Sequence, residues 1–118
     1  MAKRRPLPET RKLLVRLHCE IKTPPFSRNA RIEAGTLLGR LQNGETLRMP
    51  QSRPMPSIGP RCHELRITDN KIEWRILYRI DSAAIIIAEI FQKTTQKTPV
   101  ALIEISKRRL RIFDQDIG

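Results

Sequence analysis

The sequence of 118 residues has no long hydrophobic run and only two cysteines. Its longest apolar segment, residues 83–88, has six residues, whereas a membrane-spanning helix needs about 20. Residues 1–5 are basic like the start of a signal peptide, but Pro6 and Pro8 stand where its apolar stretch would lie. These absences predict a cytoplasmic protein without a membrane segment.

Metal ligands and catalytic motifs are also scarce. Cys19 and Cys62 permit one disulfide but form no stabilising framework, and we expect reduced thiols. Each cysteine is adjacent to a histidine, His18 or His63, and neighbours on a strand point to opposite faces, so a shared metal ion is not expected. The sequence has no glycine-rich phosphate loop, no Ser-His-Asp set and no paired-carboxylate motif. Its five aromatic residues are too few for a base-stacking surface. We expect no metal and no cofactor.

Positive charge is what the sequence has in excess. Lys and Arg number 23 against 12 Asp and Glu, which gives a net charge of +11. Hydrophobic residues make up 39%, enough for a folded core. We expect a flexible basic arm at residues 1–11, a single domain at 12–118, and a polyanionic partner.

Hydrophobic periodicity predicts a strand and a helix in the first half of the chain. Residues 12–22 alternate between apolar and polar, which favours a strand, although a helix also fits. Ser27 is a good N-cap, and apolar residues at helical spacing follow from 30 to 41, up to the Asn43-Gly44 turn. Residues 45–61 contain four prolines and no period, which predicts a long loop.

The second half predicts three strands and a helix. Residues 62–68 and 73–80 flank a turn-rich link and predict a hairpin. Residues 84–91 are nearly all apolar and predict a central strand that is buried on both faces. Thr98 and Pro99 predict the N-cap and first residue of a helix that runs to about residue 113 and ends in basic residues. The predicted fold class is α+β, with a small, mainly antiparallel sheet packed with helices.

The register of the hairpin follows from the side-chain parity of its strands. Pairing Leu65 with Ile76 places apolar residues opposite one another, and the same register puts Arg66 opposite Arg75 on the other face. Opposed like charges are destabilising, so the pair predicts a bound anion, and guanidinium groups bind phosphate in two places. The alternative is that Glu64, on the same face, neutralises one arginine.

Further candidate residues surround this hairpin. Lys93 and Lys97 lie before the last helix, whose backbone N–H groups attract phosphate, although a solvated turn is the alternative. His63 shares the apolar face and is either a histidine at the rim of the core, bonded to Tyr78, or a catalytic base. Residues 93–111 contain six basic residues and one acidic residue, which is typical of nucleic-acid binding. The expected RNA-binding residues of the last helix are Lys107, Arg108, Arg109 and Arg111.

Several motifs resemble a toxin superfamily in their order and spacing. They are CHELR at residues 62–66, WRILY at 74–78, IFQK at 90–93, KTP at 97–99 and KRR at 107–109. Together with the helix and proline-rich loop before them, they resemble the phage-derived, HigB-like branch of the RelE/ParE toxin superfamily over residues 12–113. The resemblance implies a RelE-like toxin fold and the toxin of a type II toxin–antitoxin pair.

The resemblance also implies an activity and partners. RelE and HigB toxins are ribosome-dependent endoribonucleases that cut mRNA, and their antitoxins often carry a helix-turn-helix domain. Carried over by position, Arg66 and Arg75 match the basic residues of the family's sheet face, and Lys93 and Lys97 match its basic segment after the last strand. Arginines suit stabilisation of charge on the scissile phosphate, while a lysine or His63 suits proton transfer. The implied enzyme is a metal-independent mRNA interferase that inhibits translation.

Two residues depart from the family pattern. Thr94 stands where close relatives commonly have a second basic residue, and Val100 stands where some RelE toxins present a tyrosine. Two alternatives therefore remain open. One is a ParE-like toxin that inhibits DNA gyrase by binding, and the other is a non-catalytic phage remnant that binds RNA or an antitoxin.

Overall fold

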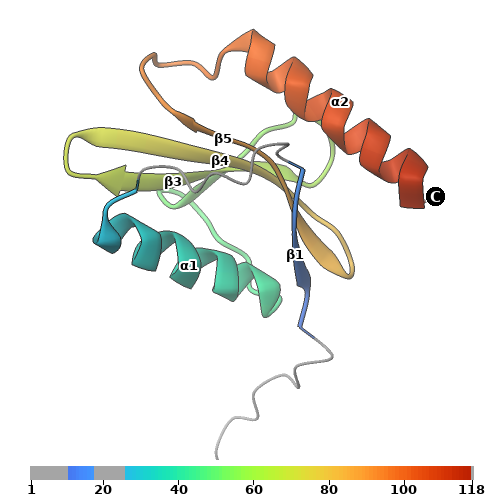
Figure 1. The fold of residues 1–118 in the computed structure, drawn as a ribbon, viewed down its shortest axis with the longest axis horizontal. Coiled ribbons are helices and arrows are strands. Elements are labelled where there is room, and N and C mark those ends of the chain that lie inside the picture. The colour runs from blue at the N-terminus through green and yellow to red at the C-terminus, as the bar shows by residue number, and fades with distance from the viewer. Residues whose placement is uncertain (1–10, 18–25, 118) are drawn as a thin grey trace, which may run out of the picture.

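The computed structural model describes residues 11–17 and 26–117, and shows a sheet with one helix on each face (Figure 1). The expected arm at residues 1–11 lies outside the described residues except for Arg11, as do residues 18–22 of the first expected strand. In the described part of the chain, no helix is long and apolar enough to cross a membrane. The elements are β1 (Leu13–Arg16), α1 (Arg28–Gln42), β2 (Ser52–Pro54), β3 (Cys62–Asp69), β4 (Ile72–Ile80), β5 (Ala84–Gln92) and α2 (Val100–Ile117).

The sheet has the strand order β1-β5-β4-β3-β2. Its first pair, β1 with β5, is parallel, and the other three pairs are antiparallel. The predicted α+β fold with a mainly antiparallel sheet is therefore confirmed, and it is compatible with a RelE-like toxin fold. Leu13, the first residue of the edge strand β1, is 66% exposed, although the alternating pattern predicts a buried position.

Helix α1 begins and ends where the sequence predicts. The Ser27 hydroxyl accepts a hydrogen bond from the Ala30 N–H at 3.2 Å, as an N-cap does. The Ser27 N–H donates to Asp69 Oδ2 at 2.8 Å, which joins the start of the helix to the end of β3. At the other end, Gly44 adopts a φ of +90°, a value that glycine tolerates best. The residues that α1 buries are Ala30, Ala34, Leu37, Leu38 and Leu41.

The hairpin of β3 and β4 has the predicted register. Leu65 pairs with Ile76, and Arg66 pairs with Arg75. The turn between the strands contains Asn70 at a φ of 57°, a left-handed conformation that asparagine adopts more readily than most residues. This register sends most apolar residues of both strands toward α1, and it places Glu64, Arg66 and Arg75 on the α2 side.

Two hydrophobic clusters cover the two faces of the sheet. The first lies under α1 and includes Leu65, Ile76 and Tyr78. The second lies under α2 and includes Leu77 and Leu110. Strand β5 contributes to both, because Ile85 and Ile87 belong to the first cluster and Ile86 and Ala88 to the second. The prediction of a central strand buried on both faces is confirmed.

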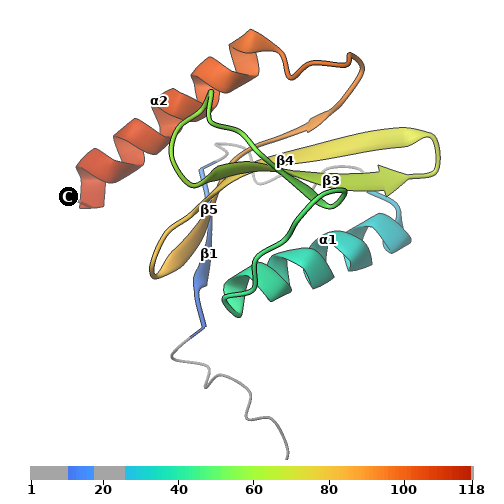
Figure 2. The same ribbon diagram turned by 180° about the vertical axis from the view of Figure 1, so that it is seen from behind.

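The segment between α1 and β3 is not the long loop that the sequence predicts, since it contains the short edge strand β2. Leu47 packs in the cluster under α1, while Met55 and Ile58 pack in the cluster under α2, so this segment passes around the edge of the sheet (Figure 2). Proline is tolerated on an edge strand, which needs hydrogen bonds on one side only. A strand of three residues is too short to show a period of two, which is why no strand pattern is visible here in the sequence.

Helix α2 differs from its prediction at both ends. It continues to Ile117 rather than to about residue 113, so its basic residues lie in the middle of the helix, and its last turn contains none. The Thr98 hydroxyl donates to Glu64 Oε2 at 2.6 Å. The Thr98 side chain therefore does not cap the helix as predicted. It joins the start of α2 to the buried carboxylate of Glu64 on β3.

Candidate functional site

Three arginines surround one buried carboxylate on the α2 side of the sheet. Glu64 has no exposed surface. Its Oε1 atom lies 3.5 Å from Arg53 Nη2 and 3.6 Å from Arg75 Nε. Arg66 Nε is 4.0 Å from the same oxygen. These separations are those of ion pairs, and Oε1 has no hydrogen-bond partner among the described residues.

Three neighbouring strands bring these charges together. Glu64 and Arg66 are alternate residues of β3 and therefore share a face. Arg75 of β4 stands opposite Arg66, and Arg53 of β2 stands opposite Glu64. The two arginines face each other as predicted. Glu64 contacts both of them, as the alternative expects, and it also contacts Arg53. The bound anion stays a prediction.

The three arginines differ in how far a ligand can reach them. The Arg75 side chain is only 7% exposed, and its Nη1 donates to the Trp74 carbonyl at 3.0 Å and to Glu73 Oε1 at 3.3 Å. The side chains of Arg66 and Arg53 are 26% and 38% exposed. Arg66 and Arg53 are therefore accessible to a phosphate, whereas the buried Arg75 contributes positive charge and an ion pair with Glu64.

Lys93 belongs to the same cluster. It follows β5, and its backbone N–H donates to the Glu73 carbonyl at 2.7 Å. Partial burial lowers the pKa of Lys93, the positive charges of Arg75, Arg53 and Arg66 lower it further, and Glu64 opposes them. A lysine whose pKa is lowered gives up its proton more readily. Burial is thus the main cause of the lowered pKa of Lys93, and the three neighbouring arginines contribute to it.

Lys97 lies beside this cluster rather than in it. It lines a cavity of about 420 Å³ between residues 53–57 and the start of α2, and Arg53 lines the same cavity. We name the cluster of Arg53, Glu64, Arg66, Arg75 and Lys93 the arginine site. The site has four basic side chains against Glu64 and Glu73, and therefore an excess of positive charge. Lys97 adds a further positive charge at the cavity that it shares with Arg53.

His63 lies on the other face of the sheet. Its ring stacks on that of Tyr78, with ring centroids 5.4 Å apart and an angle of 22° between the planes. The Tyr78 hydroxyl shares its hydrogen bond with Ser52 Oγ at 2.6 Å, so the contact with His63 is stacking and not the expected bond. Burial lowers the pKa of His63. The structure places His63 at the rim of the core and not with the arginines.

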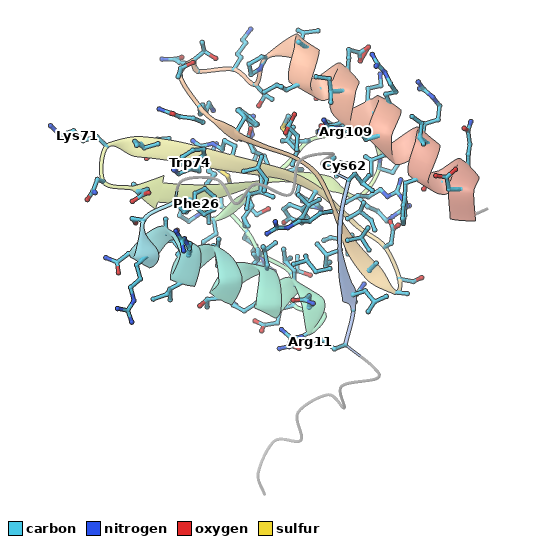
Figure 3. The ribbon with its side chains drawn as sticks, in the orientation of Figure 1. Arg11, Phe26, Cys62, Lys71, Trp74 and Arg109 are labelled. Atoms are coloured by element: carbon cyan, nitrogen blue, oxygen red, sulfur yellow. The ribbon has the colours of Figure 1, made fainter. Side chains whose placement is uncertain are left out.

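The basic residues of α2 also divide into two kinds. Arg109 Nη1 donates to the Ala88 carbonyl at 2.7 Å and lies 3.3 Å from Glu89 Oε2, so Arg109 holds α2 to β5 (Figure 3). Lys107 forms an exposed ion pair with Glu104, and Arg108 and Arg111 are exposed. The three exposed residues can contact a polyanion, whereas the guanidinium of Arg109 is bound to Ala88 and Glu89 of β5.

Lys107 and Arg111 line a second cavity, of about 500 Å³, on the same side of the sheet. Arg79 lies in its wall, and its Nε is 2.7 Å from Asp81 Oδ1. Arg79 Nη2 is 2.7 Å from Asp114 Oδ1. The guanidinium of Arg79 thus binds two carboxylates and joins β4 to the end of α2. It is therefore not available to a ligand.

The Arg79–Asp114 contact makes the fold sensitive to acid. Hydrogen bonding to Arg79 lowers the pKa of Asp114 below its ordinary 3.8. A lowered folded-state pKa gives stability that is present above 3.8 and is lost as the pH falls through the folded-state pKa. We expect the urea midpoint to fall as the pH drops from about 5 through this lowered pKa, and to fall less in Asp114→Asn. Equal pH dependence in the two proteins would contradict this role for Asp114.

The cysteines and possible metal ligands give no site in the described residues. Cys62 has a free thiol, and its burial raises the pKa of that thiol. Cys19, its possible disulfide partner, lies outside the described residues, as does His18. Over residues 11–17 and 26–117, no three His, Cys, Asp or Glu side chains gather as metal ligands would.

Sequence reasoning missed Arg53 as a site residue. Its position depends on β2 pairing with β3, and the proline-rich segment around it shows no strand pattern. The sequence suggests Glu64 only as a partner of the hairpin arginines, whereas it is the common partner of arginines from three strands. No signal in the sequence identifies Arg53, because only the pairing of distant segments brings it to Glu64.

The fold and the site together define a small α+β protein that carries a cluster of basic residues on one face of its sheet. Residues 24–111 match the family described as "Phage derived protein Gp49-like (DUF891)". The chain therefore belongs to the Gp49-like family of phage-derived proteins, a RelE toxin-like family. The matched region contains the whole arginine site and the basic part of α2. Among curated proteins, none shows significant similarity to this chain.

Proposed function

We propose that this protein is the toxin of a type II toxin–antitoxin system, of the HigB-like branch, and that it cleaves mRNA on the ribosome without a metal ion. The observation that carries the proposal is the arginine site. There, partly exposed Arg53 and Arg66 lie beside Lys93, whose pKa is lowered. A cluster of this kind suits a phosphodiester, which is anionic before cleavage and gains charge at phosphorus during it. The partners in this proposal are the ribosome, mRNA and a cognate antitoxin.

The proposed reaction is an attack of the RNA 2′-hydroxyl on the adjacent phosphorus. The attack breaks the bond from phosphorus to the 5′-oxygen and leaves a cyclic phosphate, while the 2′-hydroxyl gives its proton to water and the 5′-oxygen gains one. Arg53 and Arg66 stabilise the negative charge on the phosphoryl oxygens. Lys93 donates the proton to the leaving 5′-oxygen, and Lys97 is the second candidate for proton transfer.

The exposed basic residues of α2 extend the proposed RNA-binding surface. Lys107, Arg108 and Arg111 lie along α2, on the side of the sheet that carries the arginine site. Contacts of this kind bind the phosphate backbone without reading sequence, and salt weakens them. In this proposal they hold the RNA, while the arginine site performs the cleavage.

The test is induction of the chain in a bacterial host, with growth measured and mRNA 5′ ends mapped. We expect new in-frame cuts in translated messages, and we expect Arg66→Gln to reduce their frequency by about 10²-fold because it removes one charged donor. Arg40→Gln is the matched control, since Arg40 lies on α1 and its exposed ion pair with Glu45 is expected to contribute little.

Two results would contradict the proposal and indicate its alternatives. Growth arrest with intact messages and inhibited gyrase supercoiling would indicate a ParE-like toxin that acts by binding. Normal growth would indicate a non-catalytic protein that binds RNA or an antitoxin. Arg75→Ala is a poor test, because loss of this buried side chain removes a counter-ion of the buried Glu64 and disturbs the fold itself.

A further inference from the structure

The cavity of about 500 Å³ that Lys107 and Arg111 line has the composition of a small-molecule site. Part of its wall is apolar, since Ile58, Cys62 and Leu110 line it and are all buried. All three belong to the cluster between the sheet and α2, where Figure 3 labels Cys62. Sites for small ligands commonly enclose about 300–1,000 Å³ and combine an apolar lining with a few charged groups. This cavity meets both conditions.

Positive charge is in excess around the cavity. The basic residues that line it are Arg61, Arg79, Lys107 and Arg111. Two carboxylates oppose them, Asp114 in the wall and Asp81, which contacts Arg61 and Arg79. Both carboxylates bind the guanidinium of Arg79, so a ligand meets the other three cations. Four cations against two carboxylates leave two positive charges, which a group with two negative charges would balance.

The three remaining cations are accessible from two sides of the cavity. Arg61 precedes β3, and its side chain is 60% exposed. Lys107 and Arg111 are four residues apart on α2 and therefore share one face of the helix. Lys107 contacts only Glu104, in an exposed pair that contributes little. Arg111 has no hydrogen bond or ion pair within the described part of the chain. An anion in the cavity can therefore contact all three.

The backbone of Arg61 is strained in a way that presents its side chain. Its φ is 62°, a left-handed value that residues other than glycine, asparagine and aspartate rarely adopt. Two hydrogen bonds with Ile80 hold it there. The Arg61 carbonyl accepts from the Ile80 N–H at 3.1 Å, and Arg61 Nε donates to the Ile80 carbonyl at 3.1 Å. Strain of this kind is concentrated at functional sites, so the outlier indicates a role for the arginine side chain.

We propose that this cavity binds a free nucleotide, a nucleoside that carries a phosphate monoester. A phosphate monoester has a charge of about −2 at neutral pH, which the two surplus positive charges balance. Its oxygens contact Arg61, Lys107 and Arg111, and guanidinium groups bind phosphate in two places. The base lies on the apolar wall of Ile58 and Leu110. An internal phosphodiester of an RNA strand has only one negative charge and balances the cavity less well.

The cavity is separate from the arginine site. Cys62 in its wall precedes Arg66 by four residues of β3, which corresponds to about 13 Å. The inference therefore does not rest on the proposed function. The two are nevertheless linked, because the proposed function assigns Lys107 and Arg111 to RNA. A nucleotide bound to these two residues would weaken the binding of RNA.

The test is calorimetric titration of the full chain with the four common nucleoside 5′-monophosphates at about 0.15 M salt, which screens weak surface contacts. We expect a dissociation constant below about 1 mM for at least one of them. Arg61→Asn and Arg111→Gln should each weaken binding about tenfold. Asparagine tolerates the left-handed backbone, so the thermal midpoint of Arg61→Asn should stay close to that of the wild type. Arg31→Gln, an exposed position on α1, is the control and should bind normally.

Methyl NMR spectra locate the bound base. The signals of Ile58 and Leu110 should shift during the titration, whereas those of Leu38, under α1, should not. Absence of saturable binding, or equal weakening by Arg31→Gln, would overturn the proposal. Inorganic phosphate that binds as tightly as the nucleotide would show that the apolar wall is unused and overturn it too. Tighter binding of an RNA trinucleotide that has only internal phosphodiesters would identify an RNA strand as the occupant instead.

Discussion

Lys93→Arg should reduce ribosome-dependent mRNA cleavage by about 10²- to 10⁴-fold, the usual contribution of a general acid or base. The substitution keeps the positive charge, and hence the attraction for phosphate, but a guanidinium does not release its proton in proteins. Burial and the neighbouring arginines lower the pKa of Lys93, which suits proton donation. Single-turnover cleavage of a defined message on purified ribosomes, beside an RNA-binding assay, separates the lost step from lost affinity.

Lys71→Arg is the control for this substitution, since Lys71 is an exposed lysine in the turn of the hairpin. The wild-type rate should fall with rising pH as Lys93 loses its proton, at a pH below the ordinary lysine value of 10.5. That alkaline fall should be absent from the residual activity of Lys93→Arg. Full cleavage by Lys93→Arg would show that Lys93 supplies charge alone and would remove it from proton transfer.

Glu64→Gln should have the largest effect on stability among the charged positions of the site. The change keeps the shape of the side chain and removes the only negative charge that contacts all three arginines. Arg75, whose side chain is 7% exposed, then loses its buried counter-ion, although Glu73 still contacts its Nη1. Removal of one partner of a buried pair costs about 3–5 kcal/mol, and urea denaturation measures this as a lower midpoint.

Glu104→Gln provides the comparison for this loss. Glu104 also contacts a cation, Lys107, but its side chain is 58% exposed, and exposed pairs contribute about 0–1 kcal/mol. The urea midpoint of Glu104→Gln should therefore stay close to that of the wild type. If Glu64→Gln unfolded at the wild-type midpoint too, the arginines would not depend on the charge of Glu64, and the proposed organisation of the site would be wrong.

The register of the hairpin shows how far the sequence predicts the site. Side chains alternate along a strand, so a slip of one residue would turn the apolar residues of β3 and β4 away from the core. Burial of Leu65 and Ile76 thus determines that Arg66 stands opposite Arg75, and both pairings are found in the structure. The same rule places His63 on the apolar face, which is where it stacks on Tyr78.

Contacts between distant segments could not be predicted in this way. Arg53 reaches Glu64 through an edge strand of three residues, which is too short for a periodic pattern. Arg109 is one of several basic residues on α2, and only the packing of that helix on β5 distinguishes it from the exposed ones. In both cases the partner is a backbone or carboxyl group far away in the sequence.

The sequence by itself determined the elements other than β2 and the ends of α2, the α+β class and the pairing of Arg66 with Arg75, because these depend on local periodicity, capping residues and parity. Tertiary structure alone decided that Glu64 would join charges from three strands, that Arg75 would be buried, and that Lys93 would lie beside them. The physical reason is that burial and the interaction of charges depend on distances in space, and folding sets those distances by bringing together residues that are far apart in the chain.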